Sequence, residues 1–266
     1  MLTVSMMFLL NTIHAQSKDT AALYREFMLV CNAYKQLPLQ VNLSYKKTGN
    51  LNDVEADSIA QTAGFYIQNG GAYIHFGNKE QVINDSQLLV ILPDIRQMIL
   101  SKNDKPISSM FNGITGIPIP DSSVAKFNEG YTIAKVKNRN APVLLQITSK
   151  TLLYGYGEPV ETIALAFNPE NNYPISVITL KRSLIHFDAE DLKITLETYP
   201  AYSRYVVNIP GKGSFLVKET KTECQFKKIE NKNMAIPVVM EDRIKKDKDN
   251  NYVPAGNYID YELVQN

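Results

Sequence analysis

Short segments of alternating apolar and polar residues, separated by turn residues, fill the chain between residues 64 and 102. Phe65, Ile67, Ile74 and Phe76 occupy alternate positions on either side of an Asn-Gly-Gly sequence at 69–71. Because successive side chains of a strand point to opposite faces, these four residues are predicted to share one face of a β-hairpin. The Asn-Gly-Gly sequence supplies the positive φ angles that a tight hairpin turn requires. This pattern predicts an antiparallel meander.

A second hairpin is predicted directly after the first. It consists of residues 81–83, a polar turn at 84–86 and an apolar run at 88–92. Since that run is apolar at every position, we expect both of its faces to be covered, one by the core and the other by a helix, a second layer or a bound apolar molecule. Pro93 and Asp94 end the strand, and the alternation resumes at 95–100.

The segment before the meander predicts a helix followed by a strand. Residues 19–37 place apolar side chains at helical spacing, with Asp19 as the N-cap and Pro38 as the stop. Residues 39–46 alternate in the manner of a half-exposed strand. Residues 47–62 are polar and rich in turn formers, so we expect a loop there with a short helical piece at 53–60. The apolar stripe of the helix consists of Leu23, Phe27, Val30, Cys31 and Tyr34.

Strand patterns continue to the C-terminus after an apolar loop at 106–120, which is predicted to be a lid over the sheet or a buried connector. Turn residues separate these patterns, and no linker or repeat divides them, which favours one domain with a C-terminal extension. The predicted strands are 131–136, 143–147, 152–154, 161–167, 175–180, 192–198, 205–209, 215–219 and 223–229.

Composition limits the class of protein. The chain has 266 residues, of which 44% are hydrophobic and 21% charged, which is typical of a folded protein with a large core. The formal net charge is +1, and the basic residues are interspersed with acidic ones, which argues against a nucleic-acid surface.

The N-terminal residues 1–15 predict a secretory signal, because an apolar core is followed by the small residue Ala15 at the cleavage position. The run is too short to span a bilayer. No Lys or Arg precedes it, and the alternative is a buried N-terminal strand. No Cys follows it closely, so a lipid-anchored signal is not supported, and we expect export to the periplasm.

The search for catalytic chemistry is mostly negative, and we expect no enzyme, cofactor or metal site. His75 and His186 lie in strand patterns where a structural role is expected, and no Ser occupies a nucleophile-elbow motif. Cys31 and Cys224 could form a disulfide in an oxidising compartment, but two buried thiols are the favoured interpretation. The acidic cluster at 188–191 is interpreted as a solvated loop. The Asp and Asn residues at 247–251 resemble the opening of a calcium loop, but Tyr252 and Tyr258 occupy the positions of its turn Gly and its bidentate Glu, so no calcium site is expected.

Residues 80–98 resemble the LolA-like family of periplasmic lipoprotein carriers. The shared features are Gln81-Val82-Ile83, the turn at 84–86, the apolar strand at 88–92, Pro93-Asp94 and Gln97-Met98. The likeness covers about residues 19–180 in the order of its elements. Two features depart from the family: the apolar strand lacks a Trp, and the chain continues well beyond the usual end. The resemblance implies an α+β, mostly β fold, in which a strongly curved antiparallel half-barrel has an N-terminal helix and short helices on its concave face.

The domain organisation expected from these features is a signal peptide at 1–15, a curved-sheet domain at 16–182 and a β-rich extension of that domain at 183–266. The leading function is an exported, non-enzymatic carrier that holds a lipid or an acyl-bearing molecule beneath the sheet. The alternative is a structural subunit of a cell-envelope assembly that binds no ligand and contacts another envelope protein through 183–266. The apolar residues either line the ligand site or form an ordinary packed core; they are Phe65, Ile67, Ile74, Phe76, Val90, Leu92, Met98, Met110 and Phe111.

Overall fold

The structure is a computed structural model that describes residues 20–33, 36–51, 59–105, 124–136 and 142–266. The predicted signal at 1–15 and the apolar loop at 106–120 lie outside the described residues, as does most of the predicted helical piece at 53–60. No helix in the described part of the chain has the length and apolar character needed to cross a membrane.

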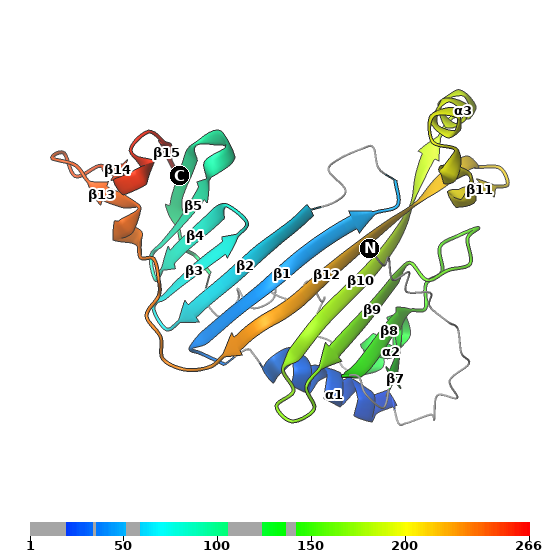
Figure 1. The fold of residues 1–266 in the computed structure, drawn as a ribbon, viewed down its shortest axis with the longest axis horizontal. Helices are drawn as coiled ribbons and strands as arrows, with labels where there is room; N and C mark the ends of the chain where they lie inside the picture. The colour runs from blue at the N-terminus through cyan, green and yellow to red at the C-terminus, as the bar shows by residue number, and fades with distance from the viewer. Residues whose placement is uncertain (1–19, 34–35, 52–58, 106–123, 137–141) are drawn as a thin grey trace, which may run out of the picture.

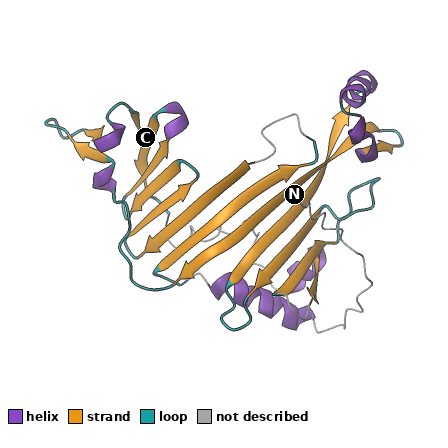
Figure 2. Ribbon diagram, viewed as in Figure 1, coloured by secondary structure: helices purple, strands orange, loops and turns teal. Residues whose placement is uncertain are grey.

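Thirteen strands of the described residues form one strongly curved sheet, which confirms the predicted mostly β fold (Figure 1, Figure 2). The order is β15-β6-β5-β4-β3-β2-β1-β12-β10-β9-β8-β7, with β11 paired to β12, so the sheet ends at β15 and β7. All its pairs are antiparallel except β15 with β6. The sheet strands are β1 Leu39–Gly49, β2 Ile59–Gln68, β3 Gly71–Phe76, β4 Lys79–Asn84, β5 Gln87–Leu92, β6 Gln97–Lys102, β7 Tyr131–Val136, β8 Val143–Ser149, β9 Glu161–Phe167, β10 Pro174–Phe187, β11 Val206–Ile209, β12 Gly213–Glu230 and β15 Glu262–Gln265.

The remaining elements are helices and a small hairpin, which lie against the sheet or at its ends (Figure 2). The α-helices are α1 Thr20–Ala33, α2 Val124–Gly130 and α3 Ala189–Thr198. The 3-10 helices are η1 Pro93–Ile95, η3 Pro200–Tyr205, η4 Met240–Asp242 and η5 Gly256–Tyr258, and the hairpin consists of β13 Ile244–Lys246 and β14 Tyr252–Pro254.

The meander predicted between residues 64 and 102 is confirmed as β2 to β6. Gly70 has a φ of +85°, which is the left-handed conformation expected of the Asn-Gly-Gly turn. The expected loop at 47–62 is wrong at both ends, because β1 continues to Gly49 and β2 begins at Ile59. Lys47 pairs with Ile59, and this cross-strand pairing outweighs the turn-forming character of the local sequence.

Residues 192–198 form part of helix α3 and not the predicted strand. Leu192, Ile194 and Leu196 satisfy both a two-residue and a four-residue apolar period, so alternation alone is ambiguous. The Asp188 side chain accepts a hydrogen bond from the backbone N–H of Asp191 at 2.8 Å, which caps the helix. The acidic cluster at 188–191 is therefore a helix start and not a loop.

Strand β12 joins the two strands that were predicted separately at 215–219 and 223–229. It lies between β1 and β10, in the middle of the sheet, although it comes from the C-terminal part of the chain. β10 and β12 extend past the ends of β9 and β1, their other neighbours, and form a two-stranded ribbon that carries α3, η3 and β11 (Figure 1). We call these three elements, residues 189–209, the head.

Helix α1 packs across β7 to β10 and β12 with the apolar stripe of its sequence. Four of the predicted stripe residues are buried, namely Leu23, Phe27, Val30 and Cys31. The ring of Phe127 in α2 lies 4.9 Å from that of Tyr24 and 6.0 Å from that of Phe27, measured between centroids. These rings cover a buried layer that consists of Ile133, Leu145, Ile147, Ile163, Leu165, Phe167, Val177 and Cys224.

Candidate apolar binding surface

One face of β1 to β5 brings together most of the predicted lining residues, and we call it the Phe65 face. Phe65 is directly opposite Ile74, and Ile67 is opposite Ala72. The register then continues through β4 to β5 and places Val90 and Leu92 on the same side. The apolar side chains of this face are Leu39, Val41, Leu43, Ala63, Phe65, Ile67, Ala72, Ile74, Phe76, Ile83, Leu88, Val90 and Leu92.

The Phe65 face has a fully buried base and a half-buried upper layer. Leu39, Val41 and Ala72 are completely buried. The larger side chains Phe65 and Phe76 retain part of their surface, although they belong to the same cluster. The same is true of Ile74 and Leu88, and Val90 and Leu92 of this face are also partly accessible. Accessible aromatic and branched side chains over a rigid base are suited to contact with a flexible apolar ligand.

Met98 does not lie with the other predicted lining residues. It is opposite Ile91 and completely buried on the other side of the meander, which we call the Tyr66 face. The 3-10 turn at 93–95 sets a register in which Gln97, and not Met98, faces Leu92. Met98 is therefore removed from the candidate surface. Met110 and Phe111 lie outside the described residues.

The Tyr66 face is covered by the C-terminal residues 238–266, which we call the tail. Met240 and Ile244 of the tail pack on Leu89, Ile91 and Met98. Strand β15 adds to the edge of β6 in parallel. The apolar run at 88–92 thus has a second layer on one side, which is one of the covers that its sequence predicted.

A charged cluster fixes the tail to the sheet. The Glu80 carboxylate accepts hydrogen bonds from Arg243 Nη2 at 2.9 Å and Nε at 3.1 Å, and from the Tyr258 hydroxyl at 2.8 Å. The Arg243 guanidinium also lies over the Tyr258 ring, 5.0 Å from its centroid. Burial, together with the bond to Glu80, raises the pKa of Tyr258 to about 12. Burial likewise raises the pKa of Tyr73, which lies close to the same carboxylate.

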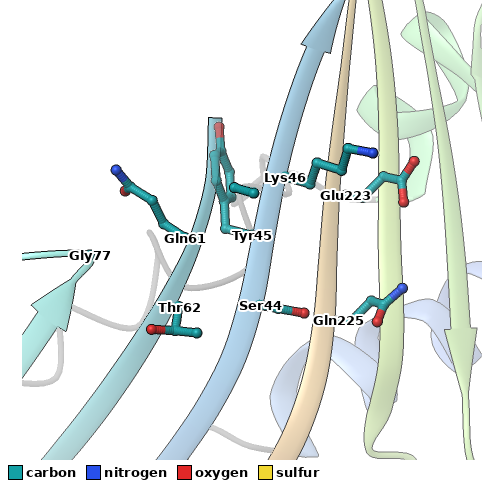
Figure 3. A pocket seen from close by; sticks show the side chains of 9 residues that line it. Ser44, Tyr45, Lys46, Gln61, Thr62, Gly77, Glu223 and Gln225 are labelled. Carbon is teal, nitrogen blue, oxygen red and sulfur yellow. The ribbon is translucent and has the colours of Figure 1, made fainter. Parts of the chain in front are cut away.

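A hollow lies where β2 extends past the β3–β4 hairpin. Its volume is about 650 Å³, and Figure 3 shows its lining side chains coming from β2, β1 and β12. Tyr45 and Gln61 belong to the Phe65 face, whereas Ser44, Lys46 and Thr62 belong to the other side. Ala60, Glu223 and Gln225 also belong to that other side, so most of the lining of the hollow lies on the face opposite Phe65.

The candidate catalytic residues occupy structural positions. The His75 imidazole lies above Gly64, where a Cβ atom would approach its Nε2 to 2.3 Å. His186 packs edge-on against Phe215, with ring centroids 5.2 Å apart. Cys31 and Cys224 are both buried in the cluster beneath α1 and are not joined by a disulfide. Burial raises the pKa of the Cys224 thiol to about 11, so the thiol stays protonated near neutral pH.

The sequence interpretation missed several residues of the surface and its surroundings. Tyr45 closes one end of the Phe65 face, with its ring edge-on to Phe76 at 5.0 Å, and it was assigned only to a half-exposed strand. Glu80, Arg243 and Tyr258 were not connected, because residues that far apart in sequence give no local signal. In the described part of the chain, no group of three or more His, Cys, Asp or Glu side chains has an arrangement that could hold a metal ion.

Comparisons with known proteins find likeness in fold only. No protein-family model and no curated protein matches the chain. Among solved structures, the MucA/MucB complex of Pseudomonas aeruginosa matches 81% of this chain with 12% identity and a TM-score of 0.40. The chain spans 59% of that structure's chain.

Two further solved structures match most of this chain. A LolA superfamily protein from Nitrosomonas europaea matches 82% of this chain and 96% of its own, with 11% identity and a TM-score of 0.26. An outer membrane lipoprotein-sorting domain from Vibrio parahaemolyticus matches 82% and 94%, with 9% identity and a TM-score of 0.27. These are similarities to solved structures, and no residue role is taken from these proteins.

Proposed function

We propose that this protein is a non-enzymatic carrier or binding protein that holds a lipid or an acyl-bearing molecule against the Phe65 face. One observation carries the proposal. Within the described residues, α1 and α2 pack over the β7–β10 half of the sheet, while Phe65, Ile74, Phe76 and Leu88 on the other half remain partly accessible. Large apolar side chains held in this state on a rigid sheet provide binding energy for an apolar guest.

The driving force would be the removal of apolar surface from water. Each Å² of apolar surface buried contributes about 25 cal/mol before the cost of ordering the ligand. The fully buried base of Leu39, Val41 and Ala72 keeps the upper layer in place, so little of this energy is spent on rearranging the protein. An acyl chain suits such a surface because it adapts to an irregular row of aromatic and branched side chains.

We also propose that the protein acts in the cell envelope after export. The support is the sequence of residues 1–15, which has the apolar core and the small residue of a cleavable signal. N-terminal sequencing of the protein secreted by its host tests this part. A start at Gln16 supports the proposal, whereas a retained residue 1 in the cytoplasmic fraction contradicts it.

The ligand proposal is tested by native mass spectrometry of the purified protein and by displacement of a fluorescent fatty acid. Phe65→Ala should weaken binding of the fluorescent acyl probe by about tenfold, since it removes a large accessible contact. The matched control is Tyr66→Ala on the same strand, because Tyr66 is also half-buried but lies on the other face. The control should bind the probe as the wild type does.

Two outcomes contradict the carrier proposal. One is the absence of any co-purified lipid together with no binding of the probe by folded wild-type protein. The other is an equal loss of binding in both variants, because that would place the probe away from the Phe65 face. Circular dichroism of each variant establishes that it is folded before binding is compared.

The alternative, an interaction subunit of an envelope assembly, is supported by the head. The head projects from the sheet on the β10–β12 ribbon, and Ile194 of α3 is 55% exposed (Figure 1). By contrast, β12 and the tail are engaged within the chain, so the head is the part of 183–266 left for a partner. Replacing residues 188–206 with a short Gly-Ser turn should abolish a discrete cross-linked species in cells; an unchanged species contradicts this alternative.

A further inference from the structure

The register of the meander and the tail aligns six side chains in one row across the sheet. The members of the row, each paired with the next, are Phe65, Ile74, Gln81, Val90, Ile99 and Val264. Since directly paired residues point to the same side of a sheet, the row extends the Phe65 face beyond β5 to β6 and β15. Five of its members are apolar, and the sixth is an amide.

This amide, Gln81, lies in apolar surroundings. Ile74 and Val90 flank it on the adjacent strands, and Ile83 follows it on the same side of β4. Lys79, which precedes it on that side, belongs to the neighbouring row. Gln81 therefore divides its own row into two apolar parts.

The hydrogen-bonding groups of Gln81 are not used within the described part of the chain. Its side chain is exposed, and no other described residue donates a hydrogen bond to it or accepts one from it. By contrast, the Gln40 side chain on the other face accepts a hydrogen bond from Lys228 at 3.3 Å. Water can satisfy Gln81 while the face is open, but a ligand that covers the row removes this water. Because burying an unpaired amide costs free energy, a ligand on this row has to offer Gln81 a hydrogen bond.

From this arrangement, and resting on the proposed function, we propose that Gln81 selects the ligand by binding an uncharged ester or amide group that lies between two apolar arms. One arm runs toward Phe65 and the other toward Val264. The side-chain amide of Gln81 carries both a donor and an acceptor, so it can bind either kind of linkage. The arms supply the affinity through apolar burial, and the central hydrogen bond fixes the position of the ligand and its specificity.

The length of the row on each side of Gln81 sets where the linkage lies in the ligand. With strands about 4.8 Å apart, about 10 Å separate Gln81 from Phe65 and about 14 Å separate it from Val264. Beyond Phe65 the row continues with Val41, which is completely buried, so the accessible part ends at Phe65. A ligand with its polar group at one end therefore leaves one side of the row uncovered or buries Gln81 beneath hydrocarbon.

The test compares two isomeric amides, N-octyloctanamide and N-methylpentadecanamide, which carry the same group in the middle and at the end of the molecule. Each is added from a cyclodextrin complex, and displacement of the fluorescent fatty acid measures its affinity. Wild-type protein should bind the central amide about tenfold more tightly than the terminal amide. Gln81→Met keeps the length of the side chain and removes its hydrogen-bonding groups, so this variant should bind the two isomers equally.

The matched control is Gln146→Met. Gln146 of β8 is also an exposed strand residue without a hydrogen bond to another described residue, but it lies on the side of the sheet away from α1. This control should keep the preference for the central amide. Circular dichroism of both variants establishes that they are folded before the affinities are compared.

The outcomes separate this inference from the proposed function. If the wild type binds the fatty acid but prefers neither isomer, or binds neither of them, the role of Gln81 is wrong and the carrier function stands. If it binds neither the fatty acid nor either amide, both proposals are wrong. A preference that persists in Gln81→Met, or that is lost in Gln146→Met, overturns the assignment to Gln81.

Discussion

One continuous face of the sheet behaves differently in its two halves. On the β7–β10 half, α1 and α2 cover a layer in which Leu145, Leu165 and Phe167 are completely buried. On the β1–β5 half, the base is equally well buried, but Phe65 and Phe76 above it keep accessible surface. Tyr45 and Phe226 contact both apolar clusters and join the halves.

We interpret this difference as one sheet that serves as a core in one half and as the proposed binding surface in the other. Both halves use the same kinds of side chain in the same alternation, so composition alone does not distinguish core from binding surface. Among the described residues, what distinguishes the two halves is whether another element lies on top of the sheet. The Tyr66 face of the meander follows the same rule, because the tail converts its apolar side chains into core.

The largest difference between the two halves is expected when one phenylalanine in each half is replaced by alanine. Phe167→Ala should cost about 3–5 kcal/mol in the free energy of unfolding, since it opens a cavity in the covered half. Phe65→Ala should cost only about 1–2 kcal/mol, because part of that ring is already in contact with water. Urea unfolding of both variants provides the measurement. Equal losses would mean that the two halves are packed alike.

A second test concerns the tail, which covers the Tyr66 face. Arg243→Met should destabilise the docked tail by about 1–3 kcal/mol, because it leaves the half-buried Glu80 carboxylate without its charged donors. Limited trypsin digestion should then cut faster after Lys245 and Lys246 than in the wild type. Asp260→Asn, which removes only the exposed bridge to Arg96, is the control and should change little. If cleavage in Arg243→Met is unchanged, the contacts of Glu80 with Arg243 and Tyr258 do not hold the tail on the sheet.

A smaller effect on the free energy of unfolding is expected from Cys224, whose thiol is buried in the covered half of the sheet. Burial raises the pKa of the Cys224 thiol from about 9 in the unfolded chain to about 11 in the folded protein. The neutral thiol therefore stabilises the folded state below pH 9, and this contribution is lost as the pH rises toward 11. The stability difference between wild type and Cys224→Ala should therefore narrow between about pH 8 and pH 10.5. Melting temperatures of both proteins measure it. A constant difference would indicate a solvated thiol.

The smallest effect is expected in the head, which lies outside both halves. The bond from the Asp191 N–H lowers the pKa of Asp188, so the capping contribution is present above the ordinary aspartate pKa and is lost as pH falls through the folded value. Asp188→Asn keeps a capping oxygen but removes the charge, so its helix content should change less between neutral and acidic pH. Circular dichroism between neutral and acidic pH tests it, with Glu190→Gln as the same-turn control. An identical response of wild type and Asp188→Asn would rule out the titrating cap.

Several features were predictable because they depend on local pattern. The α1 stripe, the Asn-Gly-Gly hairpin and the strands at 131–136 and 161–167 follow from spacing and turn chemistry, and their predicted positions are confirmed. The shared face of Phe65 and Ile74 also follows, since a tight hairpin fixes the register between adjacent strands.

Other features were not predictable because more than one structure satisfied the same pattern. Leu192, Ile194 and Leu196 fit a strand or a helix, and the cap at Asp188 decided for the helix. Met98 was assigned to the wrong face because its side depends on the register across the 93–95 turn, which a pattern of apolar residues does not specify.

The sequence alone determined that this chain forms a mostly β fold with an apolar meander, because the two-residue period and the turn residues act over short distances. Only the tertiary structure decided that β12 lies in the middle of the sheet and that the tail covers the Tyr66 face. These arrangements join segments far apart in the chain, and their energies come from burial and charge pairing that arise only once those segments meet.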